Sequence, residues 1–227
     1  MENPVIIYGG GGHAKTVISL LRLLKRNIAG IIDDGIPAGT EISGIPVLGG
    51  ADLLKELRAG GIREAVNAVG GIGNYAVRWN IFEQLRRSGF NFPTLVHPAA
   101  FVEDNVSLSD GVQVLAQSYI SSESVVGFGT LINAGVILSH ECVIGQCVNL
   151  SPGALLAGQV RIDDFAQVGM GATINLGVRI GSRARVGNSA VIKADVPSGG
   201  RVYAGSVWPL HRGSPIPQDV STLKKMA

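Results

Sequence analysis

Nearly half of the chain carries an aliphatic residue at every sixth position. Counted in blocks of six from Val96, the first residue is Val, Ile or Leu in all seventeen blocks up to Ile192, and the fifth is Ala, Val, Ser, Thr or Cys. A fixed period of six predicts a parallel β-helix, in which each block is a short strand followed by a bend. An ordinary β-sandwich is the alternative, but alternating strands do not generate an uninterrupted period of six.

The repeat also indicates how such a β-helix is stabilised. Each aliphatic side chain is expected to point inward and stack on the next coil, contributing about 1.5–3 kcal/mol before entropy is counted. Gly and Asn recur at the second and fourth positions of the blocks, where we expect them to tolerate the positive φ of a sharp bend. They are Gly111, Gly127, Gly129, Asn133, Gly135, Gly145, Gly153, Gly169, Gly171, Asn175, Gly177, Gly181 and Gly187.

Residues before the repeat show a different pattern, in which buried strands alternate with amphipathic helices. The pattern predicts strands over 5–8, 29–32 and 64–69, helices over 14–25, 51–59 and 75–88, and a short extended link over 45–49. A strand, a glycine turn, a helix and a second strand form a βαβ unit. We therefore predict an α/β domain with a parallel sheet over 1–93, a β-helix over 94–205 and a C-terminal tail over 206–227.

Composition narrows the possible classes of protein. A formal charge of +2 indicates no polyanionic partner, so we expect no nucleic acid, and no apolar run is long enough to cross a bilayer. The first residues lack the order of a secretory signal, which favours a cytoplasmic protein. Only two cysteines are present, which is no disulfide framework; Cys142 is expected to face the coil interior and Cys147 to lie near a bend.

The glycine turn at 9–12 is the first candidate binding site. Gly9, Gly11 and Ala14 fit the spacing GxGxxA between a strand and a helix, and Asp33 ends the second strand. Free N–H groups at a helix N-terminus bind an anionic group such as a phosphate. A nucleotide ligand other than NAD, NAD itself and a purely structural turn all remain open, although a β-helix is a poor substrate domain for a dehydrogenase.

Two histidines of the repeat differ in their surroundings. His97 precedes a proline where the chain enters the β-helix, which favours a structural role. His140 occupies an outward third position beside Glu141, and an imidazole with a neighbouring carboxylate can act as a general base; a solvated surface histidine is the alternative. Gly158 lies one full coil after His140, where its N–H could stabilise an oxyanion.

Together these motifs resemble one group of proteins. The repeat is similar to that of the left-handed β-helix (hexapeptide-repeat) acyltransferases. The segments 6–13, 33–34, 139–141 and 149–154 resemble the bacterial nucleotide-sugar acetyltransferases that make N-acetylated amino sugars such as bacillosamine and perosamine, with sialic acid O-acetyltransferases among the relatives.

The resemblance implies an assembly and a set of contacts. It implies coils that wind left-handed and a homotrimer with acetyl-CoA in the cleft between neighbouring subunits. His140 would be the general base, supported by Glu141. The residues implied to bind the nucleotide sugar are Gly11, Gly12, His13, Asp33 and Asp34, to which we add Gly70; those implied to lie along the CoA cleft are Asn149, Gly158 and Met170.

We therefore predict an acetyl-CoA-dependent N-acetyltransferase that acts on a nucleotide-linked amino sugar. Two alternatives are an O-acetyltransferase on a sugar hydroxyl, which would use the same base, and a non-catalytic nucleotide-sugar-binding protein. A zinc hydratase on the same β-helix needs three protein ligands, whereas the coils offer only His97 and His140, so we expect no metal.

Overall fold

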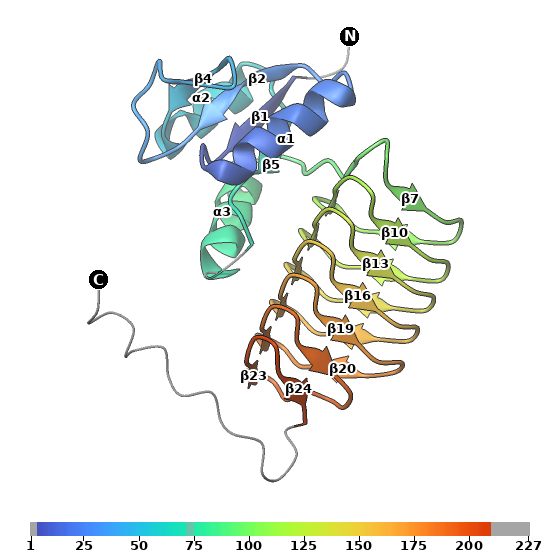
Figure 1. The fold of residues 1–227 in the computed structure, drawn as a ribbon. Coiled ribbons are helices and arrows are strands. Elements are labelled where there is room, and N and C mark those ends of the chain that lie inside the picture. The colour runs from blue at the N-terminus through green and yellow to red at the C-terminus, as the bar shows by residue number, and fades with distance from the viewer. Residues whose placement is uncertain (1–3, 72, 74, 210–227) are drawn as a thin grey trace, which may run out of the picture.

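The computed structural model describes residues 4–71, 73 and 75–209, which form an α/β domain beside a β-helix (Figure 1). The α/β sheet has the order β3-β4-β2-β1-β5, and its buried strands β1 and β2 are flanked by α1 on one face and α3 on the other. Its elements are β1 Val5–Tyr8, α1 Gly12–Leu23, β2 Ile28–Ile32, β3 Glu41–Ile42, β4 Ile45–Gly49, the 3₁₀ turn η1 Ala51–Leu53, α2 Leu54–Ala59, β5 Glu64–Asn67 and α3 Tyr75–Arg87.

The segment 45–49, predicted as a short extended link, is extended as predicted, but it is also a strand of the sheet, which the prediction missed. β4 pairs in parallel with β2 and in antiparallel with the short strand β3, which makes one edge of the sheet a hairpin. Ser43 and Gly44 form its two-residue turn, both with positive φ (50° and 73°), which matches the twist of the flanking strands. The sheet is therefore mixed rather than wholly parallel.

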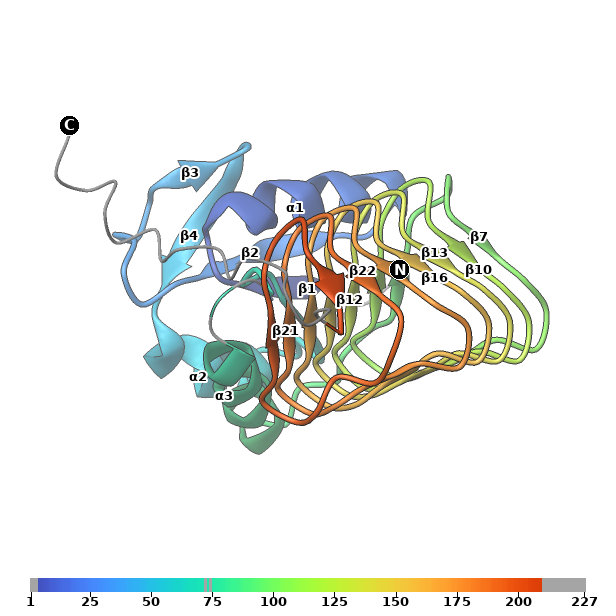
Figure 2. The ribbon, with the colours of Figure 1, turned by 60° about the horizontal axis from the view of Figure 1, so that its bottom comes forward.

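The repeat folds into a left-handed parallel β-helix, as predicted. Up to Ile192, paired strands are 18 residues apart, so three blocks make one coil, and the coils stack with a triangular outline (Figure 2). The last coil is two residues shorter, because Arg185 pairs with Arg201 and Val191 with Val207, 16 residues later. The first sheet is β6 Leu95–Val96, β9 Gln113–Val114, β12 Leu131–Ile132, β15 Asn149–Leu150, β18 Gln167–Val168, β21 Arg185–Val186 and β23 Arg201–Val202. The second is β7 Phe101–Val102, β10 Tyr119–Ile120, β13 Ile137–Leu138, β16 Leu155–Leu156, β19 Thr173–Ile174, β22 Val191–Ile192 and β24 Val207–Trp208, and the third is β8 Ser107–Leu108, β11 Val125–Val126, β14 Val143–Ile144, β17 Arg161–Ile162 and β20 Arg179–Ile180.

First-position and fifth-position side chains fill the interior of the coils, as the period predicts. Our expectation for the glycines was only half right. Every fourth position from Asn105 to Ser189 has positive φ, whether or not it is glycine. The second-position glycines have ordinary φ, and a Cβ on Gly127 or Gly187 would lie 2.4–2.6 Å from backbone atoms of the next coil. Glycine at the second position therefore serves close approach between coils.

The two parts of the chain share packed side chains. Leu95 of β6, Leu115 just after β9 and Leu131 of β12 share one buried cluster with the apolar face of α1, while Phe82 of α3 packs against Phe128. The domain limits stay predictions, although β24 lies beyond residue 205; most of the predicted tail, 210–227, lies outside the described residues. No described helix is long and apolar enough to cross a membrane, and the cytoplasmic location stays a prediction.

Candidate active site

His140 lies at the corner where one coil passes from β13 to β14. Its side chain is 54% exposed, as expected for an outward third position. Glu141 follows at a fourth position with φ 59°, and this left-handed turn brings its carboxylate back beside the imidazole. The local geometry of the coil therefore places the two side chains together.

Hydrogen bonds fix the orientation and the tautomer of the His140 ring. Nδ1 lies 2.9 Å from Oε2 of Glu141, and Gln159 Nε2 donates to the same oxygen at 3.1 Å. These two donors lower the pKa of Glu141, His140 contributing most, so Glu141 is an acceptor at neutral pH. Assigned from this network, Nδ1 is the donor to Glu141, so in the neutral ring Nε2 is the nitrogen that carries the lone pair. The imidazole is thus oriented as a base, and Gln159 is a member of the site that the sequence analysis missed.

Gly158 lies directly beneath the imidazole, one coil further on. A Cβ at this position would lie 2.5–3.1 Å from Cε1, Nε2 and Nδ1 of His140, so only glycine leaves room for the ring. Among the described residues the Gly158 N–H has no hydrogen-bond acceptor. Gly158 therefore leaves room for the imidazole and also presents beside it an N–H group without an acceptor in the described part of the chain.

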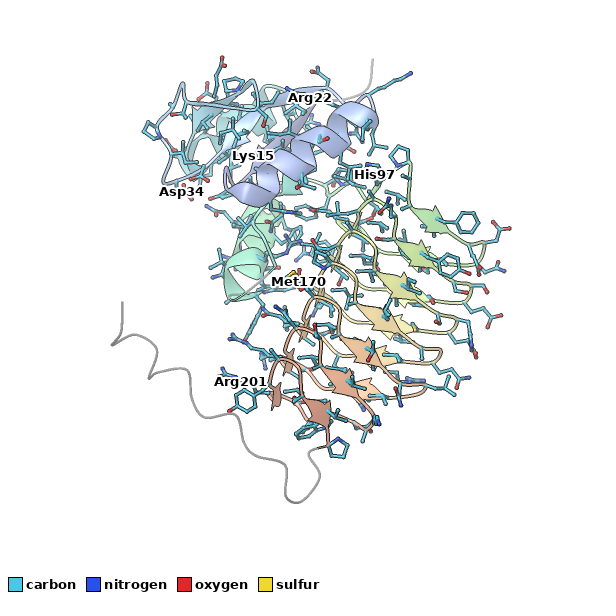
Figure 3. All side chains as sticks on the ribbon, in the orientation of Figure 1. Lys15, Arg22, Asp34, His97, Met170 and Arg201 are labelled. Atoms are coloured by element: carbon cyan, nitrogen blue, oxygen red, sulfur yellow. The ribbon has the colours of Figure 1, made fainter. Side chains whose placement is uncertain are left out.

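The glycine turn lies at the carboxyl end of β1 and opens into α1. Gly11 is the N-cap of α1 and Gly12 is its first residue; both are exposed, and a Cβ on either would meet no atom within 4 Å. Lys15 and Arg22 mark the first and last turns of this helix in Figure 3. The open N–H groups at this end can receive a phosphate.

Asp33 and Asp34, the two aspartates predicted to bind the nucleotide sugar, already accept hydrogen bonds from backbone N–H groups. Asp33 accepts hydrogen bonds from the N–H groups of Gly10 (2.7 Å) and Gly35 (2.8 Å), which fixes the glycine turn. Asp34 accepts from the Tyr8 hydroxyl at 2.6 Å and from the Ala51 N–H. Burial, followed by the bond to Asp34, raises the pKa of Tyr8. Each carboxylate thus shapes this edge of the sheet.

His13 is engaged with the β-helix. Its Nε2 lies 2.8 Å from Oε1 of Gln113, whose own Nε2 donates to the Asn67 carbonyl, so His13 is the donor in this pair. Burial lowers the pKa of His13, although the bond to Gln113 opposes the shift. A Cβ on Gly70 would lie 4.0 Å from the Cβ of His13, which places Gly70 at the same edge. His13 is therefore a neutral link between the two domains.

The three residues predicted along the CoA cleft are spread over different parts of the β-helix. Gly158 shares the corner of His140, whereas Met170, 46% exposed, lies at the corner between β18 and β19. Asn149 is only 3% exposed and lies under Gly71, where a Cβ would come within 2.3 Å of its Oδ1. One copy of the chain does not bring Met170 and Asn149 to His140.

His97 lies where the chain enters the β-helix, near α1 in Figure 3. Its Nδ1 accepts the N–H of Ala99 at 3.0 Å, which closes the entry turn, and its ring borders a cavity of about 380 Å³ with Lys15 and Ala134. Among residues 4–71, 73 and 75–209, no three His, Cys, Asp or Glu side chains are grouped to hold a metal ion.

Comparisons with known proteins show the family of the chain. Residues 4–85 match the family described as the PglD N-terminal domain. GDP-perosamine N-acetyltransferase (PerB) from Caulobacter crescentus, solved with CoA and GDP-perosamine, is 34% identical with a TM-score of 0.84, covering 90% of this chain and 96% of that one. The chain belongs to the hexapeptide-repeat sugar acetyltransferases.

Other members of these sugar acetyltransferases show the same likeness. The acetyltransferase domain of PglB from Neisseria gonorrhoeae, solved with acetyl coenzyme A, is 30% identical with a TM-score of 0.83, covering 92% of this chain and all of that one. A variant of the Caulobacter enzyme with one histidine replaced by alanine was also solved with CoA and GDP-perosamine, at 33% identity and a TM-score of 0.85. No curated protein matches the chain significantly.

Proposed function

We propose that the chain transfers the acetyl group of acetyl-CoA to the amino group of a nucleotide-linked amino sugar, with His140 as the general base. The observation that carries this proposal is the orientation of the His140 imidazole. Glu141, held by Gln159, accepts from Nδ1 and leaves Nε2 without a partner among the residues that the structure describes, and Gly158 leaves room for the ring. Similarity over 90% of the chain to an enzyme solved with CoA and GDP-perosamine supports the class of both substrates.

The acceptor is proposed to bind at the carboxyl edge of the α/β sheet. The open N-terminus of α1 at Gly11 and Gly12 would receive the diphosphate, with Gly70 beside it. Asp33 and Asp34 keep lone pairs beyond those used by the backbone and could accept from a ribose or a base edge. His13 would act here through its link to Gln113, holding the edge in place.

The transfer itself follows from the orientation of His140. Nε2 removes a proton from the acceptor amine, and Glu141 stabilises the imidazolium that results. The amine nitrogen attacks the thioester carbonyl, and the oxyanion that forms can accept the Gly158 N–H. The carbon–sulfur bond then breaks, and the CoA thiolate takes the proton back from the imidazolium. Holding both substrates together makes a bimolecular step effectively unimolecular.

We propose that the enzyme is a homotrimer with sites between subunits. His140 and Met170 lie at different corners, one on each side of the second β-helix sheet, so a neighbouring copy is needed to bring both to one CoA. Several outward residues of that sheet are apolar and exposed, among them Phe101, Ile137 and Leu155, which favours burial against other copies.

The test compares His140→Ala and His140→Asn with the wild-type enzyme. We expect kcat to fall about 10²–10⁴-fold while the affinities for CoA and for the acceptor stay nearly unchanged. A variant that keeps near-wild-type turnover would remove His140 from the role of base.

The acceptor is identified with a panel of UDP-, GDP-, dTDP- and CMP-linked amino sugars and their hydroxyl analogues. The panel shows which nucleotide the enzyme prefers and separates N- from O-acetylation.

A further inference from the structure

Arg78 is a buried cation that the proposed chemistry does not use. It lies on α3 and is 2% exposed. Nη1 donates to the Val69 carbonyl at 2.5 Å and Nη2 donates to the Gly129 carbonyl at 2.9 Å. Among the described residues no carboxylate lies within ion-pair distance of its guanidinium. Burying a charge is costly without a compensating partner, so this cation needs an explanation.

The charge lies just behind the edge proposed to receive the diphosphate. Val69, whose carbonyl Arg78 holds, packs against Gly9 of the glycine turn, because a Cβ on Gly9 would lie 2.8 Å from Cγ2 of Val69. The next residue, Gly70, lies against His13. The guanidinium therefore holds the carbonyl of a residue whose side chain contacts the glycine turn.

A continuous set of hydrogen bonds joins the same cation to both domains. Nη1 of Arg78 also donates to the Asn67 carbonyl at 3.5 Å, the same carbonyl accepts from Gln113 Nε2, and Gln113 accepts from His13. The main-chain carbonyl of Arg78 separately accepts from Asn67 Nδ2 at 2.9 Å. On the other side Arg78 reaches the β-helix at Gly129. Removing the guanidinium would therefore release the Val69 and Gly129 carbonyls, and with them the residue that packs against the glycine turn.

We propose that Arg78 is a positioning residue for the acceptor: its unpaired charge attracts the diphosphate at the glycine turn and its hydrogen bonds hold that turn on the β-helix. This rests on the proposed function. An anion at the turn would supply the counter-charge that the described protein lacks, and the interaction is long-ranged because a buried charge is screened little by water and salt.

Cys147 offers a second way to test the charge without removing Arg78. A Cβ on Gly129 would lie 3.2 Å from its Sγ, so the thiol lies close to the carbonyl that Arg78 holds. Burial raises the pKa of this thiol to about 11, while the positive charge of Arg78 opposes the shift. Cys147→Asp places a carboxylate beside Arg78, and Cys147→Ser is a neutral control of the same size.

The measurements are the Kd for UDP and GDP by calorimetry, and KM and kcat for the acceptor found in the panel. We expect Arg78→Gln to raise the Kd of the preferred nucleoside diphosphate and the acceptor KM about tenfold, and Cys147→Asp about threefold. Arg78→Lys, which keeps the charge, should recover part of the affinity. The kcat at saturation and the Kd for CoA should stay within about twofold of wild type in every variant, a split that general loss of structure would not produce.

Unchanged nucleotide affinity in both Arg78→Gln and Cys147→Asp would overturn the inference and leave the acetyltransferase intact. If Arg78→Gln does not fold, the comparison of nucleotide affinity between Cys147→Asp and Cys147→Ser tests the inference by itself. The carboxylate of Cys147→Asp can still be accommodated, because it lies beside the positive charge of Arg78. A wild-type protein that binds neither UDP nor GDP, and transfers no acetyl group to any acceptor of the panel, would overturn the proposed function and this inference with it.

Discussion

Gly158 leaves the space that the His140 imidazole occupies. Adding one methyl group in Gly158→Ala would place a carbon 2.5–3.1 Å from three ring atoms, so the ring must leave its position beside Glu141. We expect kcat to fall about 10–100-fold, because a misplaced base costs much of its contribution. Steady-state kinetics measure the fall in kcat, and the Kd for the nucleotide, which we expect to stay unchanged, is the control.

The double variant separates displacement of the ring from other effects of the methyl group. If Gly158→Ala acts through His140, adding it to His140→Ala should lower kcat no further, because residues that act together are not additive. A further loss in the double variant would instead indicate that the methyl group disturbs CoA or the oxyanion.

Sequence analysis identifies His140 and Glu141 because they are neighbours in the chain. It does not identify Gln159, which reaches Glu141 from the next coil, or Gln113, which meets His13 across 100 residues. Both glutamines are common polar residues in the repeat, and only the folded structure shows what they face. Partners at long separation leave no local signal in one sequence.

The second β-helix sheet begins at a corner that Glu103 holds together. Its carboxylate accepts hydrogen bonds from the Tyr119 hydroxyl, the Ser121 hydroxyl and the Ser122 N–H. These donors, Tyr119 first, lower the pKa of Glu103 to about 2. The folded state therefore binds this proton less tightly than the unfolded chain, and the stabilisation is present above the ordinary carboxyl pKa of about 4 and is lost as the pH falls towards 2.

We predict that Glu103→Gln lowers the unfolding temperature at neutral pH and that its difference from wild type shrinks between about pH 4 and pH 2. Thermal unfolding followed by circular dichroism over this range measures it, and Asp104→Asn, on the exposed neighbour, is the control. A difference that does not depend on pH would assign the effect to packing instead of ionisation.

The coils need glycine for two separate reasons, and one pair of variants distinguishes them. A Cβ on Gly127 would lie 2.6–2.8 Å from backbone atoms of residues 145 and 146, whereas one on Gly177, with φ 69°, would meet nothing within 4 Å. We expect Gly127→Ala to cost about 2–4 kcal/mol of unfolding free energy. Gly177→Asn should cost less than about 1 kcal/mol, because asparagine tolerates positive φ. Denaturant unfolding of both variants decides.

Among the elements, the period of six predicts the strands of the β-helix, because every block buries its first and fifth side chains in the same way. The hairpin of β3 and β4 escapes prediction, since Ile45–Gly49 contains a proline and two-residue strands carry little pattern. What makes β4 a strand is its pairing with β2, a tertiary contact that propensity does not encode.

For the whole molecule, the sequence predicts two domains but not how they pack. Their arrangement depends on single contacts such as those of Leu115 and Leu131 with α1, and on polar links such as His13 with Gln113. These residues satisfy the period of six like any others. The position of the proposed nucleotide-binding edge relative to the β-helix therefore emerges only when the chain is folded.

The proposed shared site makes a prediction about mixed trimers. Leu155→Glu puts a charge on the exposed apolar sheet, and we expect a lower mass by sedimentation together with loss of activity; Gln117→Glu, on an exposed turn, is the control. A mixture of two inactive variants tests the shared site directly. If His140 and Met170 of one site come from different copies, mixed trimers of His140→Ala and Met170→Glu should recover activity. Random mixing would give intact residues at about a quarter of the sites, since each site draws one corner from each of two copies. No recovery, from trimers shown to exchange subunits, would place the whole site within one chain.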